Sequence, residues 1–341
     1  MRGAAIARAL ERAGIECDLR FCSPSVYGDT GLSRRWPKLR PLFYPAALVS
    51  RLGQLDLRDD DLAFFQRPMF EWPVVWLERL VARGRPAIFD FDDAIYLNFR
   101  GREKLRQMVA LVDGVIAGNR TLAEVAAAPE KTTVIPTVLD LERYTPRRDH
   151  LGRGAQVTVG WTGTHGNYRQ LAIAKEGIAR ALRRTGARFL IIADRPPPPE
   201  LAELSPEFLP WRPDTEVEDL ARIDVGVMPL PDNPYSRGKC GFKLLQYMAL
   251  GHPGVASPVG VNADIIHHGE NGFAARDDRE WEQGLVALID DPQLRSRMGA
   301  AARARVEAEY SITAVLPRYL ALFDRCWGRA APDARPADTA A

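Results

Sequence analysis

The sequence is poor in cysteine: its 341 residues include four, Cys17, Cys22, Cys240 and Cys326. Their separations fit no metal-ligand spacing, and scattered cysteines of this kind are typical of reduced thiols inside a cell. The sequence also lacks an apolar run of 18 or more residues, so no membrane-spanning helix is predicted. Its first residues lack the basic, apolar and small-residue regions of a signal peptide. We therefore expect a cytoplasmic protein whose membrane contact, if it has any, is peripheral.

An excess of one charge sign is absent as well. Lys and Arg together number 46 and Asp and Glu together 44, which gives a formal net charge of +2. Such a balance produces no broad field for a polyanion, so no nucleic-acid partner is expected. Hydrophobic residues make up 46% of the chain, which is ordinary for a globular protein with a substantial core. Any anion-binding site must therefore come from local placement of charge.

Short apolar segments alternate with amphipathic ones along the chain. This alternation is typical of parallel sheets covered by helices on both faces. The polar stretch 140–154 interrupts it and is interpreted as a linker between two α/β units of similar size. Strands are expected at 62–66, 87–91, 114–117 and 133–135, and after the linker at 157–161, 189–193, 225–228, 254–257 and 273–275.

The order of elements at the N-terminus is unusual. A helix is expected at 4–12 and a strand at 15–22, whereas an α/β domain normally opens with a strand that leads into a helix. We therefore expect a first strand and its glycine-bearing loop to lie upstream of Met1. A domain that lacks this strand is the alternative.

A basic, glycine-containing loop leads into the helix expected at 242–250. Arg237, Lys239 and Lys243 supply positive charge, and Gly241 stands where the helix begins. Helix N-termini present free N–H groups and a partial positive charge, and glycine lets the backbone approach an anion closely. The pattern predicts a diphosphate-binding loop. A solvated basic turn that caps a helix is the alternative.

Several segments together resemble the retaining, family 4-type (group 1) glycosyltransferases of the GT-B fold. The helix Leu244–Gly251 reads LLQYMALG, 252–262 reads HPGVASPVGVN, and 265–273 reads IIHHGENGF. Residues 134–144 are similar to the family's interdomain segment, and 159–164 to the opening strand and loop of its second domain. The resemblance implies an α/β, GT-B fold of two Rossmann-like domains with parallel sheets facing an interdomain cleft. They would be an acceptor domain (1–148) and a donor-binding domain (149–328). The tail (329–341) is rich in Ala, Pro and Asp, and its composition predicts disorder.

The resemblance also implies an activity. A hexose-type sugar would pass from a nucleoside diphosphate sugar to a glycan, lipid-linked or small-molecule acceptor, with retention, as in polysaccharide biosynthesis. No cofactor beyond the donor substrate is expected. One alternative is a non-catalytic sugar-nucleotide or glycan-binding relative. Another is a sugar-nucleotide epimerase of the same fold, which would need several carboxylates and histidines in the cleft where this chain has few.

One departure from the family pattern concerns the donor. These enzymes typically carry two glutamates eight positions apart, the second of which holds the ribose hydroxyls. Here the two positions are Gly238 and Gln246. Glutamine has only one accepting terminal atom and no charge, so the donor geometry is open to question. Lys239 and Lys243 would compensate by binding phosphate.

Two further loops belong to the expected donor site. Gly163, Thr164 and His165 follow a strand and precede a helix, as a phosphate-binding loop does. The resemblance places this loop against the donor diphosphate or the acceptor. His165 could donate to phosphate or lie near the reacting hydroxyl, and a merely exposed histidine is the alternative. Gly260 and Asn262 lie where the family contacts sugar or phosphate, and Asn262 would otherwise cap the next helix.

The first domain contributes charged residues at strand ends. Asp92 and Asp93 follow the strand at 87–91 and could bind sugar hydroxyls, act as a base or hold a metal; capping of the segment that follows the strand is the alternative. The sequence shows no other carboxylate cluster that would complete a metal site, and the resembled fold does not usually need one, so no metal is expected. Arg67 follows the strand at 62–66 and is predicted to bind the acceptor or diphosphate, with a surface ion pair as the alternative.

Overall fold

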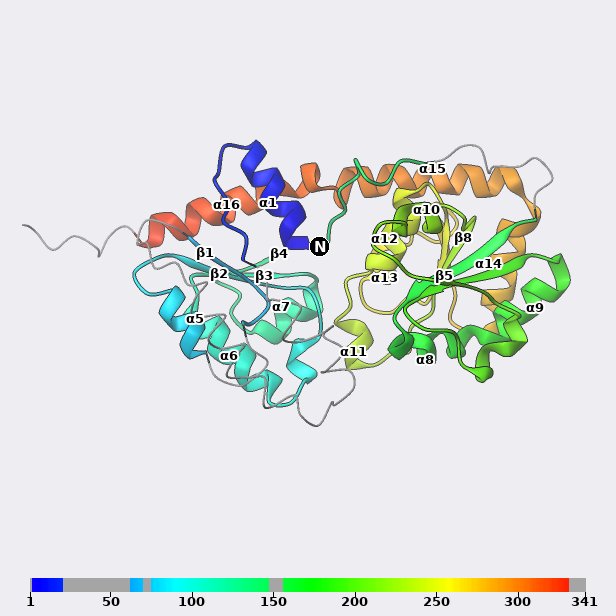
Figure 1. Ribbon diagram of the computed structural model, residues 1–341, viewed down its shortest axis with the longest axis horizontal. Helices are drawn as coiled ribbons and strands as arrows, with labels where there is room; N and C mark the ends of the chain where they lie inside the picture. The colour runs from blue at the N-terminus through cyan, green and yellow to red at the C-terminus, as the bar shows by residue number, and fades with distance from the viewer. Residues whose placement is uncertain (1, 21–61, 70–74, 147–155, 331–341) are drawn as a thin grey trace, which may run out of the picture.

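The computed structural model describes residues 2–20, 62–69, 75–146 and 156–330. These residues form two parallel sheets, one in each half of the chain (Figure 1). The first sheet has the order β1-β2-β3-β4, and its strands are β1 (Ala63–Gln66), β2 (Ala87–Phe91), β3 (Gly114–Ala117) and β4 (Thr132–Val134). The second has the order β10-β9-β8-β5-β6-β7, and its strands are β5 (Thr158–Gly163), β6 (Arg188–Ala193), β7 (Glu207–Pro210), β8 (Val225–Met228), β9 (Gly254–Ala256) and β10 (Gly272–Ala274). The predicted α/β architecture with two parallel sheets is confirmed.

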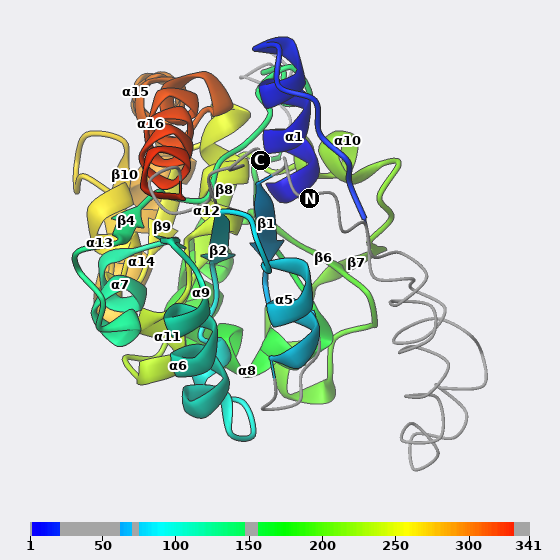
Figure 2. The same cartoon turned by 90° about the vertical axis from the view of Figure 1, so that its left-hand side faces the viewer.

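The first sheet is covered on both faces (Figures 1 and 2). Below it in Figure 1 lie α5 (Trp76–Val81), α6 (Gly101–Leu111) and α7 (Arg120–Ala126); above it lie α1 (Arg2–Arg12) and α16 (Ile312–Ala330). Successive side chains of β2 point to opposite faces of the sheet. Phe89 and Phe91 pack with α6 and α7, whereas Ile88 packs with Tyr319 of α16. Strands buried on both faces account for the nearly continuous apolar runs in the sequence.

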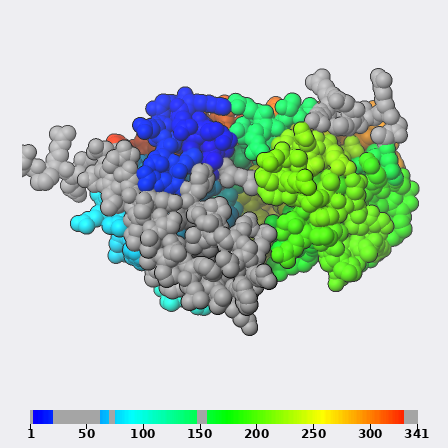
Figure 3. Space-filling view, in the orientation of Figure 1, coloured from blue at the N-terminus to red at the C-terminus, as the bar shows by residue number. Residues whose placement is uncertain are grey.

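The last helix returns to the first domain. The predicted division at 149 assigns α16 to the second domain by sequence, yet its apolar residues Val315, Tyr319 and Leu322 pack against the first sheet together with Ile6 of α1. The space-filling view shows α1 on the outside of the first domain (Figure 3). The division point 148/149 and the tail residues 331–341 lie outside the described residues.

The second sheet is also sandwiched between helices. One face carries α8 (Tyr168–Leu171), α9 (Lys175–Thr185) and α14 (Asp278–Asp290), packed around the buried Trp161 and Trp281. The other face carries α10 (Glu216–Leu220), α12 (Phe242–Ala249), α13 (Asn262–Ile265) and α15 (Pro292–Glu309). Side-chain caps fix where helices begin: Asp277 accepts from Glu280 N–H at α14, and Asp291 accepts from Leu294 N–H at α15.

Three local differences from the sequence expectations have simple causes. The strand expected at 15–22 is wrong for the described part, because 15–20 pairs with no strand and Ile15 is 37% exposed; Phe21 and Cys22 lie outside the described residues. Strand β7 was not expected: it is an edge strand, half exposed, and contains Pro210. Helix α11 (Pro234–Arg237) is a single turn started by the Asn233 side chain, too short to show a period.

A close backbone approach at Gly226 of β8 gives a test of packing in the second domain. A methyl group on Gly226 would overlap the ring of Tyr247, which is fully buried and accepts a hydrogen bond from Thr162 N–H at 2.9 Å. We expect Gly226→Ala to lower the free energy of unfolding by about 2–3 kcal/mol, the cost of overpacking a core. Gly328→Ala in α16 is the matched control: its methyl would meet open space, so stability should stay equal or rise slightly. Chemical denaturation measures both, and equal stability of the two variants would contradict this packing.

Candidate active site

The loops at the carboxyl ends of the two sheets contact each other. Tyr96, in the loop after β2, donates from its hydroxyl to the carbonyl of Pro234 at 3.1 Å. Asn119, directly after β3, donates from Nδ2 to the carbonyl of Lys239 at 2.9 Å. Both acceptors belong to the basic loop that follows β8. The sheets therefore face one another with the edges at which α/β sheets bind ligands.

The basic loop fits the first domain without spare room. A methyl group on Gly118 would lie 2.5 Å from Cys240 Sγ, and one on Gly238 would lie 2.7 Å from Ala94 Cβ. Cys240 itself is 8% exposed and packs within the apolar core of the first domain. Two glycines thus permit the contact through which the first domain holds the loop that carries Arg237 and Lys239.

Lys243 occupies a confined position at the start of α12. Its Nζ lies 4.3 Å from the ring centroid of Trp161, and a methyl group on Gly163 would come within 2.6 Å of it. Burial, helped by the nearby charge of Lys239, lowers the pKa of Lys243 to about 7. No carboxylate among the described residues forms an ion pair with this ammonium, so a bound anion would favour its charged form.

The other two cations are more open. Lys239 Nζ lies 4.5 Å from the ring centroid of Tyr235, and Arg237 is exposed and paired with Asp232 at 2.6 Å. Gly241, with φ of +71°, begins α12, and Gly260, with φ of +55°, follows β9. Both backbones lie in the left-handed region that favours glycine. A methyl on Gly260 would lie 3.0 Å from Arg237 Cα, so the loops after β8 and β9 are packed together.

Asn262 has a supporting place in this arrangement. It is 1% exposed, and its Nδ2 donates to the carbonyl of Ser257 at 3.2 Å. It does not cap α13 with its side chain, because the capping residue is Val261. A side chain so enclosed holds the loop that contains Gly260 and has almost no surface to offer a ligand.

His165 forms a dyad that the sequence did not reveal. Its Nδ1 lies 2.6 Å from Asp194 Oδ2, and its backbone N–H donates to Asp194 Oδ1, also at 2.6 Å. Desolvation raises the pKa of Asp194, but the hydrogen bonds from His165 outweigh it, so this pKa lies below the usual value. A carboxylate on Nδ1 leaves Nε2 as the outward-facing nitrogen. Asp194 follows β6 directly, and that position was the available signal. Thr164, beside the dyad, is exposed and accepts from Asn167 Nδ2.

Gln246 belongs to a buried polar network. Its Nε2 donates to the Tyr144 hydroxyl at 2.9 Å and to Glu216 Oε1 at 3.2 Å, and Trp211 Nε1 donates to the same Glu216 oxygen at 3.2 Å. Burial raises the pKa of Tyr144 to about 12, so the phenol stays neutral. A glutamate at 246 could not donate to Glu216 and would repel it. The glutamate that the family carries at the position of 246 thus has a counterpart in Glu216, whose carboxylate lies directly beside the Gln246 side chain.

Arg67, Asp92 and Asp93 meet at the carboxyl edge of the first sheet. Arg67 Nη2 lies 3.2 Å from Asp92 Oδ1 and 3.9 Å from Asp93 Oδ2. The backbone of Arg67 has φ of +68°, which is costly for a residue other than glycine and often marks a functional position. Asp92 also lies beside Gly118, because a methyl there would be 3.0 Å from Asp92 Cα. These charges therefore border the contact made by Cys240.

The structure brings most of the predicted residues to the junction of the two domains. One group comes from three segments of the second domain, at or after the ends of β5, β8 and β9: Gly163, Arg237, Lys239, Gly241, Lys243, Gly260 and Asn262. Thr164 and His165 extend it along β5 and β6, Gln246 lies one helical turn deeper in α12, and Arg67, Asp92 and Asp93 border it from the first domain. Within the described part of the chain, no three His, Cys, Asp or Glu side chains are grouped so as to hold a metal ion.

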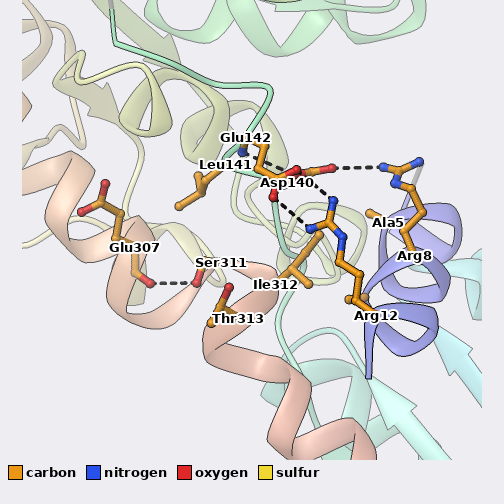
Figure 4. A pocket seen from close by; sticks show the side chains of 11 residues that line it. Ala5, Arg8, Arg12, Asp140, Leu141, Glu142, Glu307, Ser311, Ile312 and Thr313 are labelled. Carbon is orange, nitrogen blue, oxygen red and sulfur yellow. Dashed lines mark hydrogen bonds and ion pairs between the residues drawn. The ribbon is translucent and has the colours of Figure 1, made fainter. Parts of the chain in front are cut away.

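A separate pocket lies beside the interdomain segment (Figure 4). Its volume is about 290 Å³, and α1, residues 140–142 and the start of α16 line it. Arg8 pairs with Asp140 at 3.1 Å and Arg12 with Glu142 at 2.9 Å, so its charges neutralise one another. None of the predicted site residues lines it. A diphosphate would find its cationic partners at α12, and we place the candidate site there.

Comparison with known proteins defines the class of this chain. The structure is similar to that of Anabaena HepE in complex with UDP and glucose, with a TM-score of 0.62 and 16% identity, over 93% of this chain and 88% of that one. The structure is also similar to that of sucrose-phosphate synthase from Thermosynechococcus elongatus, with a TM-score of 0.66 and 16% identity, over 95% of this chain and 92% of that one. The fold is GT-B, as the sequence predicted.

The second domain matches a known family. The model of glycosyl transferases group 1 matches residues 156–291, which supports the resemblance to group 1 glycosyltransferases over this part of the chain. Trehalose synthase of Pyrococcus horikoshii is 32% identical over 88 residues, 26% of this chain and 21% of that protein. D-inositol 3-phosphate glycosyltransferase of Pseudarthrobacter chlorophenolicus is 35% identical over 133 residues, 38% of this chain and 29% of that protein. The matches thus span less than a third of either curated relative.

The contact between Asn119 and the basic loop can be tested with one atom changed. Asn119 Oδ1 caps α7 by accepting from Leu122 N–H, while Nδ2 serves the loop. Asn119→Asp keeps the cap and removes the donor. We expect amide exchange in residues 234–241 to accelerate roughly fivefold, since a hydrogen bond contributes about 1 kcal/mol. Exchange mass spectrometry measures this. Asp277→Asn, which alters the cap of α14 alone, should leave the segment unchanged, and equal protection in all three proteins would rule the contact out.

The buried network predicts a conflict when Gln246 is replaced by the family's usual residue. We expect Gln246→Glu to lower the free energy of unfolding by about 2 kcal/mol at pH 8, because two carboxylates then share one buried site. Their repulsion raises a folded-state pKa, so this loss shrinks as the pH falls towards 5. The double variant Glu216→Gln with Gln246→Glu, which swaps the two side chains, should recover most of the lost free energy of unfolding. Chemical denaturation at pH 8 and pH 5 measures these free energies of unfolding. A Gln246→Glu variant as stable as the wild type at both pH values would contradict the network.

Proposed function

We propose that this chain is a glycosyltransferase that moves a hexose-type sugar from a nucleoside diphosphate sugar to a glycan, lipid-linked or small-molecule acceptor, with retention at the anomeric carbon. One observation carries the proposal. Arg237, Lys239 and Lys243 gather around the N-terminus of α12, at the junction where the carboxyl ends of two parallel sheets meet. Free N–H groups and cations together suit a diphosphate.

The names of similar proteins support the choice of donor. The Anabaena HepE structures contain UDP or UDP-glucose, and the pneumococcal O-GlcNAc transferase GtfA was solved with UDP and GlcNAc. The curated relatives carry names of sugar-transferring or sugar-forming enzymes. On this basis we propose a uridine diphosphate hexose as the donor. The acceptor would approach from the first domain, where Arg67, Asp92 and Asp93 lie.

The proposed chemistry concerns charge on the leaving group. As the bond between the anomeric carbon and the diphosphate breaks, negative charge grows on the departing oxygen. Lys243, whose pKa is lowered to about 7 without a ligand, would become fully charged beside it and stabilise it within a confined site. The acceptor hydroxyl adds to the anomeric carbon on the face that the diphosphate leaves, and its proton passes to the departing phosphate oxygen.

The remaining polar groups would orient the sugars. Asp92 and Asp93, held in place by Arg67, would accept hydrogen bonds from acceptor hydroxyls. The outward Nε2 of His165, held by Asp194, can exchange a hydrogen bond with a sugar hydroxyl or a phosphate oxygen. Gln246 lies one turn beyond Lys243 in α12, and its buried network with Glu216 would support the part of the site that receives the ribose.

Lys243 gives the proposal a pH signature. Donor binding selects the ammonium form, so affinity should fall as the pH rises through 7 and the free protein loses this proton. We expect the Kd for UDP-glucose to be roughly tenfold weaker at pH 8.5 than at pH 6.5, since a one-unit pKa change corresponds to about 1.4 kcal/mol. Lys243→Arg should bind with little pH dependence, and Lys243→Met weakly at every pH. Calorimetric titration measures these constants.

Controls separate the proposal from its rivals. Lys175→Met, on α9 away from the junction, should keep the wild-type profile. A thermal-shift panel of UDP-, GDP-, ADP- and dTDP-sugars identifies the preferred nucleotide. Donor binding without turnover would indicate a non-catalytic relative, and release of an epimerised sugar nucleotide would indicate an epimerase. Affinity and transfer that survive Lys239→Ala with Lys243→Ala would refute the diphosphate assignment.

A further inference from the structure

Helices α5 and α6 both lie in the outer layer of the first domain (Figure 1). A buried ion pair joins them: Lys104 Nζ of α6 lies 2.8 Å from Glu78 Oε1 of α5. Both helices cover the face of the first sheet opposite to α1 and α16 (Figures 1 and 2). Since Glu78 and Lys104 point towards each other inside the protein, residues about half a turn away on each helix point outward.

The outward positions are arginine-rich. On α5 and the turn after it, Trp76, Arg79 and Arg83 follow helical spacing and are exposed. On α6, Arg102 and Arg106 are exposed four residues apart. Together with Arg100 they form a surface that we call the α5–α6 face. Glu103, half-buried and bonded to Arg100, is an acidic residue within this surface. The full chain balances 46 basic against 44 acidic residues, so this face concentrates positive charge locally.

An apolar projection completes the α5–α6 face. Phe99 is 86% exposed and Leu97 42%, in the turn that leads into α6. The following residue, Arg100, has φ of +53°, a left-handed backbone that is costly for arginine. Trp76 adds a second aromatic ring, 48% exposed. Full burial of a phenylalanine is worth about 1.5–3 kcal/mol, and the folded chain forgoes this at Phe99.

We propose that the α5–α6 face docks on an anionic lipid bilayer. Arginines bind lipid phosphates, and aromatic side chains prefer the boundary between headgroups and acyl chains. The combination fits a membrane better than a nucleic acid, because projecting Phe99 and Leu97 gain burial in a lipid boundary and would find only phosphates along a duplex. Among the described residues no helix is long and apolar enough to cross a bilayer, so the attachment is peripheral.

The inference does not depend on the sugar donor, and it has a consequence for the acceptor. The α5–α6 face belongs to the same domain as Arg67, Asp92 and Asp93. Docking through it would hold that domain at the membrane and leave the second domain free to bind a soluble donor. Lipid-linked acceptors would then reach the junction from the bilayer side.

Vesicle sedimentation tests the proposal with the full chain. Vesicles of phosphatidylcholine with or without phosphatidylglycerol are mixed with the protein, and the partition coefficient is measured. We expect at least tenfold stronger binding to the anionic vesicles, weakened by raised salt because the attraction is screened. Phe99→Ser and the pair Arg102→Glu with Arg106→Glu should each lose about tenfold. The matched pair Arg180→Glu with Arg184→Glu, four residues apart on α9, should bind like the wild type.

The outcomes are decisive in both directions. Thermal unfolding of each variant, with and without UDP-glucose, checks that the fold and the donor site are retained. Equal binding to both kinds of vesicle, or wild-type binding by the Phe99 and arginine variants, would overturn the proposal. Tighter association with duplex DNA or RNA than with anionic vesicles would overturn it as well and assign the face to nucleic acid. If the wild-type protein failed to bind UDP-glucose, the proposed activity would be refuted, but the membrane-binding result would still stand.

Discussion

The arrangement of the site depends on one contact between the domains: Cys240 inserted into the first domain opposite Gly118. No side chain larger than hydrogen fits at 118, since even a methyl would lie 2.5 Å from Cys240 Sγ. Asn119, the next residue, binds the carbonyls of Arg237 and Lys239. The loop that brings cations to α12 thus takes its shape from both domains. The affinity for a ligand at the start of α12 would therefore depend on the relative position of the domains, because the loop carries groups that bind it.

The same constraint explains why glycines stand where they do. Gly118 and Gly238 allow close approach across the junction, whereas Gly241 and Gly260 supply left-handed backbone to the loops of the second domain. Lys243 Nζ then lies over the ring of Trp161, and the positive charge of Lys239 acts on it. Such a group is costly to the empty protein and becomes favourable once an anion is present, so the cost is recovered on binding.

The strands and most helices could be predicted because each is a local pattern of apolar and polar residues. Strands β2, β3 and β8 were located to the residue, while β7 was missed because an edge strand with Pro210 shows no clear alternation. Segment 15–20 looked like a strand, but no strand pairs with it in the described chain. Pairing is a long-range property, which a local pattern does not contain.

The candidate site was predictable as a set of loops but not as a set of contacts. The rule that ligands bind at the carboxyl ends of strands leads to Gly163, His165 and the basic loop. It gives no indication that His165 meets Asp194, 29 residues away, that Gln246 meets Glu216, 30 residues away, or that Asn119 meets Lys239, 120 residues away. Gln246 illustrates why contacts matter. In the sequence it is only a departure from a family pattern, whereas in the structure its amide donates to the buried carboxylate of Glu216.

The return of α16 to the first sheet affects how the domains can move. The chain passes between them twice, once after β4 and once where α15 gives way to α16 near Ser311, and Leu139 bonds to Tyr310 and Ile312 where these crossings run side by side. Two adjacent strands of backbone resist twisting and sliding but permit rotation about the line that joins them. Any change in the angle between the two domains would therefore hinge at these crossings and alter the access to α12.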